Sequence, residues 1–122
     1  RNYQARNLLR DEIKIEDRVL FYHSNAKPPG AVGTAIVVKD AYPDFTAWDP
    51  ESAHPDPRST EESPIWFMVD IKADQTFKNF VSLRQIKSTV ELSEMVLVKN
   101  SRLSVQPVTE SEYEIIVEMG MD

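Results

Sequence analysis

Aromatic residues stand beside amide, hydroxyl or carboxylate residues at several points of the sequence, and this combination suits a binding site for a planar base. The clearest case is the run from Phe21 to Asn25, and the others are Tyr3, Tyr42 near Asp44, and Trp66. An aromatic face can stack a base with about 1–3 kcal/mol, while amide and hydroxyl groups recognise its hydrogen-bonding edge. Because flipping a base out of a duplex costs about a few kcal/mol, several such contacts must converge.

The alternation of side chains along a strand divides the run from Phe21 to Asn25 between two faces. Phe21 and His23 should share one face, with Tyr22 and Ser24 on the other. The alternative role for each aromatic residue is core packing. We predict a core role for Phe21, Phe67 and Phe77, and we leave both roles open for Tyr22 and Trp66.

Catalytic and metal-binding patterns are not evident in the sequence. His23 and His54 are the two histidines, and neither belongs to a zinc-binding pattern. A metal site of Asp49, His54 and Asp56 is conceivable, but a polar loop rich in turn-forming residues explains these side chains better. Neighbours such as His23 and Ser24 point to opposite faces of a strand and form no catalytic pair. We therefore predict a binding domain rather than an enzyme, with no metal site.

Charge is unevenly distributed along the chain. The net charge of −6 argues against an unspecific grip on nucleic acid. Residues 1–40 carry a net charge of +2, residues 41–75 of −6, residues 76–108 of +3 and residues 109–122 of −5. If the first and third blocks meet in space, an acidic protein can still have a basic face; otherwise these charges are ordinary solvated surface.

The pattern of apolar residues and turn signals predicts short strands with a few small helices. We expect strands over 18–23, 31–39, 65–71 (continuing toward Phe77) and 103–108, and helices over 3–10, 82–87 and 109–118. The segment 95–98 fits either type. Gly33 predicts a bulge or a close backbone approach, and the proline-rich stretch 42–64 predicts a long loop. These elements indicate one α+β domain built as a compact mixed barrel.

The compartment follows from two further features. The chain has no cysteine, which fits a reducing compartment, and no apolar run approaches the roughly 20 residues that span a bilayer. We expect a cytoplasmic protein, or a nuclear one if the source is eukaryotic.

Five ordered motifs together resemble the EVE domain family. They are Arg1–Asn7, Phe21–Asn25, Ala41–Asp44, Trp66–Asp70 and Leu103–Pro107, and the likeness covers nearly the whole of residues 1–122. The resemblance implies a PUA-like fold, a curved mixed β-barrel flanked by short helices, and kinship with the YTH and SRA-type readers of modified bases. It also implies a partner, DNA or RNA that carries a modified base such as a modified cytosine, and no cofactor.

The resemblance further implies a set of site residues. The base pocket would involve Asn2, Tyr3, Tyr22, Ser24, Asn25, Tyr42 and Trp66, and phosphate contacts would come from Arg1, Arg6, Lys27 and Arg102. The segment Leu103–Pro107 would close the barrel nearby. Family members usually have a further strand and a tryptophan before the stretch that matches Arg1 and Asn2, so we expect this EVE domain to be incomplete at its N-terminus.

Two other functions stay open from the sequence alone. PUA-like relatives include hydrolases that process nucleic acids or nucleosides, and such an activity here would need His23 or Asp44 in the pocket. Alternatively, an exposed strand edge could pair with another chain, which would make this a protein-interaction module.

Overall fold

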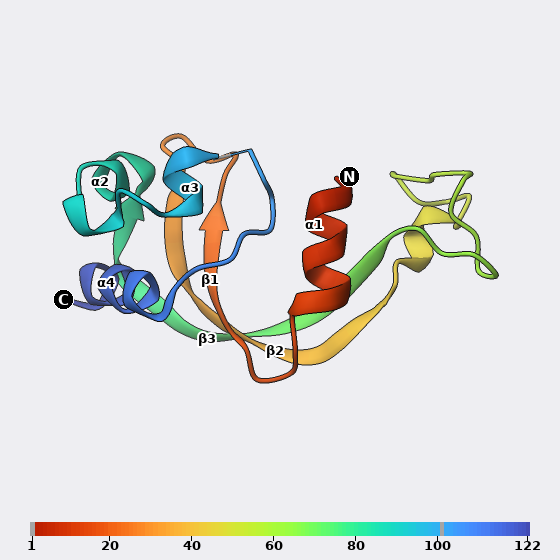
Figure 1. The fold of residues 1–122 in the computed structure, drawn as a ribbon, viewed down its shortest axis with the longest axis horizontal. Helices are drawn as coiled ribbons and strands as arrows, with labels where there is room; N and C mark the ends of the chain where they lie inside the picture. Colours follow the sequence, from red (N-terminus) through yellow and green to blue (C-terminus); the bar gives the residue numbers. More distant parts are fainter. Residues whose placement is uncertain (1, 101) are drawn as a thin grey trace.

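A curved, three-stranded antiparallel sheet runs through the computed structural model, which describes residues 2–100 and 102–122. Its strands are β1 (Arg18–His23), β2 (Gly30–Pro43) and β3 (Phe67–Ser82), in the order β1-β2-β3. Figure 1 shows β2 and β3 as two long bent strands that curve beneath β1, α1 and α3, with α2 and α4 gathered at one end. No helix in the described part of the chain is long and apolar enough to cross a membrane.

The two long strands are irregular where the sheet bends. The register between β2 and β3 shifts between Ala31 and Gly33 and at three later points. At Gly33 the strands approach so closely that an added Cβ would lie 2.3 Å from the Gln75 carbonyl oxygen. The predicted close approach at Gly33 is therefore confirmed, and such irregularities bend a sheet and increase its twist.

Most of the short helices begin at capping residues that the sequence shows. Asn2 accepts hydrogen bonds from the backbone of Gln4 and Ala5 at the start of α1 (Tyr3–Asn7), which continues as the π-helical turn η1 (Leu8–Glu12). Ser82 and Gln85 form a capping box at α2 (Leu83–Lys87). The predicted helix over 3–10 is therefore confirmed as to place, although its second half has π-helical geometry.

The C-terminal half contains three further helical elements. They are the 3-10 turn η3 (Val90–Leu92), α3 (Val96–Lys99) and α4 (Glu110–Met121). The predicted capping box of Thr109 and Glu112 is confirmed at the start of α4. The segment 95–98, which fitted helix or strand, forms α3.

One core joins the inner face of the sheet to these helices. α4 packs so closely on β3 that a Cβ at Gly120 would lie 2.4 Å from the Phe77 ring. Full burial of an aliphatic side chain such as Ile86 or Leu92 stabilises the fold by about 1.5–3 kcal/mol. The buried members of the core are Ala31, Phe77, Val81, Ile86, Leu92, Met95, Leu97 and Ile116.

Two predictions about these elements are wrong. Phe21 is not a core residue: it is 43% exposed, and its ring meets that of His23 edge-on with centroids 5.4 Å apart. Residues 103–108 form no strand. The Gln106 side chain donates to the backbone carbonyls of Asn100 and Leu103 and Pro107 has no N–H to donate, so the segment is held by local bonds instead of a ladder.

The α+β class is confirmed by the antiparallel sheet and its short helices. Among the described residues the sheet is entirely antiparallel, and β1 pairs with β2 alone. The predicted long loop is also confirmed: residues 44–66 connect β2 to β3 and contain the 3-10 turn η2 (Phe45–Ala47).

Candidate functional site

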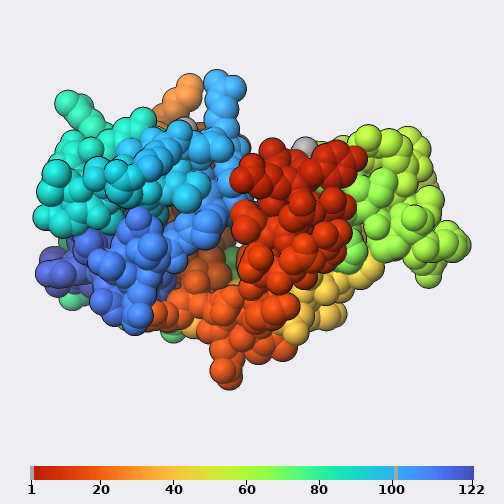
Figure 2. All heavy atoms as spheres, viewed as in Figure 1, coloured from red at the N-terminus to blue at the C-terminus, as the bar shows by residue number. Residues whose placement is uncertain are grey.

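A pocket of about 340 Å³ lies between β1 and the segment 102–108. That size is at the small end of ligand-binding pockets in general. Figure 2 shows a furrow on this side of the molecule, between the C-terminal segment in blue and the N-terminal helix in red. Apolar side chains form most of the wall, among them Leu20, Ala31, Met95, Leu97, Leu103 and Ile116.

β1 contributes Tyr22 and Ser24 to this pocket. Tyr22 pairs with Ala31 across the sheet, and Ala31 belongs to the core, so the ring points to the inner face. Burial raises the pKa of Tyr22 further above neutral, and the protonated hydroxyl can donate a hydrogen bond. Ser24 is exposed where β1 ends, which places a hydroxyl at the rim.

The opposite rim carries Arg102, Ser104 and Gln106. The Gln106 Nε2 group donates to the carbonyl oxygens of Asn100 at 2.7 Å and Leu103 at 2.9 Å. Because both partners are carbonyl oxygens, which only accept, the NH2 group of the Gln106 amide must face them. Its Oε1 acceptor therefore points away from these two carbonyls. The site therefore combines an apolar wall with donors and an oriented acceptor at its rim.

Ser104 and Gln106 are site residues that the prediction from sequence missed. The available signal was the motif Leu103–Pro107, which we interpreted as a strand that closes a barrel. Along a strand only alternate side chains face a pocket. In the observed irregular segment, Leu103, Ser104 and Gln106 all line the pocket. A spacing of this kind follows no strand or helix periodicity that could be recognised in the sequence.

A second group of predicted residues gathers at α1 and at the end of the long loop. Tyr3 stacks on Trp66 with ring centroids 4.9 Å apart. Trp66 is only 5% exposed, and its Nε1 donates to Asp56 Oδ2 at 2.8 Å. The Asn2 side chain caps α1. None of these residues lines the pocket at β1.

Asp56 organises this second group. Besides Trp66, it accepts hydrogen bonds from the Arg58 side chain at 3.2 Å and 3.0 Å and from the Arg58 backbone. These bonds, first from the Arg58 side chain and then from Trp66, hold the pKa of Asp56 well below its usual range. The carboxylate is therefore charged at all ordinary pH values and holds the Arg58 and Trp66 side chains in place.

An open groove of about 600 Å³ runs along the long loop beside Asp56. It is lined by Asp44, Thr46, His54, Asp56 and Arg58, together with two prolines. Across the described residues, no group of three or more His, Cys, Asp or Glu side chains is placed to share a metal ion.

Tyr42 lies farther along β2. Its hydroxyl donates to Asp70 at 2.6 Å, and this bond raises the pKa of Tyr42. The Lys39 ammonium lies 4.2 Å from the ring centroid of Tyr42. These contacts hold Tyr42 against β3, and it does not line the pocket at β1.

The structure therefore divides the predicted site residues. It brings Tyr22, Ser24 and Arg102 together at the pocket. Asn25 and Lys27 are exposed in the loop that follows β1. Asn2, Tyr3, Arg6 and Trp66 form the second group, Tyr42 stands apart, and Arg1 lies outside the described residues.

Comparison with known sequences finds a family and several relatives. A sequence model of the EVE domain matches residues 1–119. The chain is 43% identical to mouse thymocyte nuclear protein 1 and 41% identical to the human protein of the same name, each over 127 aligned residues. These alignments cover 98% of the chain but 56% of each relative, so the chain spans about half the length of the curated relatives that it matches.

Solved structures show the same fold in relatives. The chain matches a hypothetical protein from Leishmania major with a TM-score of 0.93 and 48% identity, covering 98% of the chain and 76% of the relative. It matches the human THYN1 protein, crystallised in complex with DNA that contains 5-methylcytosine, with a TM-score of 0.92 and 40% identity. That match covers 100% of the chain and 75% of the human protein.

Proposed function

The chain belongs to the EVE domain family, and from this premise we propose that it is a non-catalytic reader of a modified nucleobase. The first candidate is 5-methylcytosine in DNA. We propose that the base enters the pocket between β1 and the segment 102–108, because this pocket has the apolar wall and polar rim that a base requires.

One observation carries the proposal: the human THYN1 protein, which is 40% identical to this chain over their alignment, was crystallised with DNA that contains 5-methylcytosine. The alignment covers the whole of this chain with a TM-score of 0.92. A fold so similar supports the expectation that β1 and the segment before α4 take corresponding places in the two proteins.

The pocket offers a separate contact for each part of a methylated cytosine. The Gln106 Oε1 atom, turned away from the Asn100 and Leu103 carbonyls, can accept from the 4-amino group. The hydroxyl of Ser24 can donate to a ring acceptor. The 5-methyl group would lie against the apolar wall. Burial of one methyl group contributes about 0.8 kcal/mol, which corresponds to about a fourfold preference over cytosine.

The base must leave the duplex to reach this pocket. Extrusion costs about a few kcal/mol, and a stack on an aromatic ring returns about 1–3 kcal/mol. Tyr22 is the aromatic residue on the inner face of β1 that supplies this stack. We therefore propose that the protein binds a modified base more tightly in a mismatch or a single strand than in a perfect duplex.

Positively charged side chains near the pocket would bind the phosphate backbone of the nucleic acid. Arg102 lines the pocket and is exposed, and Lys27 is exposed in the loop after β1. We propose both as phosphate contacts that orient the strand without selecting its sequence.

The test is a binding titration on the full protein. Oligonucleotides that differ in one cytosine, unmodified, 5-methylated or 5-hydroxymethylated, are titrated by fluorescence anisotropy as duplexes and as single strands. We expect tighter binding of a modified form, and we expect Ser24→Ala to weaken binding of all three forms alike, because they share the ring acceptors that Ser24 would contact. Equal affinity for all three forms would overturn the proposal. Incubation of the same oligonucleotides with and without divalent metal should yield no product, and any turnover would favour the hydrolase alternative.

We also propose that the curved sheet is part of a closed PUA-like barrel. The TM-scores of 0.92 and 0.93 to relatives support this, as does the strong bend of β2 and β3 (Figure 1). Hydrogen exchange on the full protein tests barrel closure, because closure would protect the amides along both edges of β1.

The cellular location is a separate proposal. The vertebrate relatives are named as nuclear proteins, and we propose the nucleus if the source is a eukaryote and the cytoplasm otherwise.

A further inference from the structure

The second group of side chains, away from the pocket, contains two arginines beside an exposed tyrosine. Tyr3 is 49% exposed although one of its ring faces stacks on Trp66. The guanidinium carbon of Arg6 lies 5.1 Å from the centroid of the Tyr3 ring. Arg58 joins this group from the long loop, because Asp56 accepts from both Arg58 and Trp66, the ring on which Tyr3 stacks; Asp56 first, and then Tyr3, raises the pKa of Arg58.

The backbone and neighbouring side chains hold Arg6 in place. Its NH1 atom donates to the Ile65 carbonyl oxygen at 2.9 Å, which links α1 to the residue before Trp66. Its Nε atom donates to Asn7 Oδ1 at 2.7 Å. Both acceptors are neutral, so these bonds orient the guanidinium without cancelling its charge. An oriented guanidinium loses less entropy when it binds an anion.

Arg58 is held by a different partner. Its Nε and NH2 atoms donate to the two oxygens of Asp56, yet its side chain remains 65% exposed. Asp56 also accepts from Trp66. These donors keep the Asp56 carboxylate charged. With one negative charge on Asp56 and one positive charge on each arginine, the three side chains have a net charge of +1.

We propose that Tyr3, Arg6 and Arg58 form an arginine seat for one backbone phosphate of the bound nucleic acid. The inference rests on the proposed function and adds a contact outside the base pocket. A phosphate over the exposed part of Tyr3 would receive donors from two guanidinium groups and from the phenol hydroxyl. Arginine suits this role because its planar fork presents paired N–H donors to phosphate oxygens.

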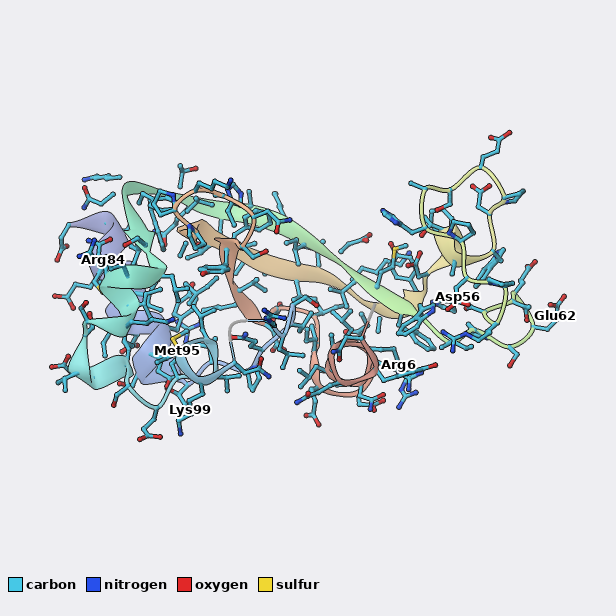
Figure 3. All side chains as sticks on the ribbon, turned by 90° about the horizontal axis from the view of Figure 1, so that it is seen from above. Arg6, Asp56, Glu62, Arg84, Met95 and Lys99 are labelled. Atoms are coloured by element: carbon cyan, nitrogen blue, oxygen red, sulfur yellow. The ribbon has the colours of Figure 1, made fainter. Side chains whose placement is uncertain are left out.

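The position of the arginine seat distinguishes it from the pocket rim. Arg6 belongs to α1 and Arg58 to the long loop, whereas the pocket is built by β1 and the segment 102–108. Figure 3 shows Arg6 and Asp56 on the same side of the molecule, at the end opposite to Arg84. A strand whose base occupies the pocket would therefore extend across α1 to reach the arginine seat.

The test uses the salt dependence of DNA binding by the full protein. The affinity for a duplex with one 5-methylcytosine is measured between about 50 and 200 mM salt for the wild type and for Arg58→Ala and Arg6→Ala. Loss of one phosphate contact should lower the slope of log K against log salt by about 0.9. It should also weaken binding by about tenfold, equally for methylated and unmethylated DNA.

Two further variants make the outcome specific. Arg84→Ala removes one exposed positive charge at the far end of the molecule and should leave the slope unchanged. Arg58→Lys keeps the charge without the planar fork, so it should keep the slope and weaken the affinity. Circular dichroism should show that each variant retains the wild-type fold.

The arginine seat is overturned if Arg58→Ala and Arg6→Ala keep the wild-type slope, or if Arg84→Ala lowers the slope as much as they do. Failure of the proposed function gives a different result. In that case the wild type does not distinguish methylated from unmethylated DNA, while the slopes still decide whether a phosphate binds at Arg6 and Arg58.

Discussion

Replacement of Gln106 by alanine tests the bonds that this side chain makes to two backbone carbonyls together with the contact to the base that we propose for it. Gln106→Ala removes hydrogen bonds to the Asn100 and Leu103 carbonyls of 2.7 and 2.9 Å. Each such bond contributes about 1 kcal/mol net, so the variant should lose about 2 kcal/mol. For a chain of 122 residues, this corresponds to a melting temperature lower by about 7 °C if unfolding is two-state. The proposed bond to the base is lost as well.

The assay combines thermal unfolding with binding of a 5-methylcytosine oligonucleotide. Gln75→Ala is a matched control, because Gln75 is an exposed glutamine on β3 that does not line the pocket; it should change neither quantity. We expect Gln106→Ala to bind about tenfold more weakly, for cytosine and 5-methylcytosine alike, since both carry the 4-amino group. A variant that melts as the wild type and binds within twofold of it would refute both roles of Gln106.

Three further predictions concern stability, each measured by urea unfolding. Thr109→Ala should cost about 1 kcal/mol, and adding Glu112→Ala should cost less than the sum, because the two residues share one capping box; strictly additive losses would argue against that box. Gly33→Ala should cost about 2 kcal/mol or more, since its Cβ would meet the β3 backbone at 2.3 Å; an unchanged midpoint would show that the strands can separate there. The lowered pKa of Asp56, chiefly due to Arg58, stabilises the fold above the unfolded pKa of about 3.9, and this stabilisation is lost as the pH falls below it. Asp56→Asn should therefore lose less stability than the wild type between about pH 4.5 and pH 2.5, and parallel curves would contradict this.

The elements with local signals could be predicted from the sequence. β1 has the predicted bounds of Arg18–His23, because β-branched and aromatic residues there are followed by turn formers. The capping boxes at Ser82 and Thr109 mark the starts of α2 and α4, because a cap is an interaction between residues three positions apart. The close approach at Gly33 was also visible, since only glycine leaves room for it.

The membership of the EVE domain family was likewise visible in the sequence. Five motifs in a fixed order carry it, and the family match over residues 1–119 confirms it. The base-reading function that the resemblance implied agrees with the DNA bound to the human relative. Motifs record which residue types a family keeps, so they predict a class of function without the positions of side chains in space.

Only the tertiary structure decided which side chains share a site. Tyr22 and Gln106 are 84 positions apart in the numbering, and they line one pocket because the segment after α3 crosses the inner face of β1. Tyr3 and Trp66 could both have faced a base, but their rings stack on each other and Trp66 is buried. Contacts between residues distant in sequence depend on how the chain closes and packs, and no local pattern of residue types contains that information.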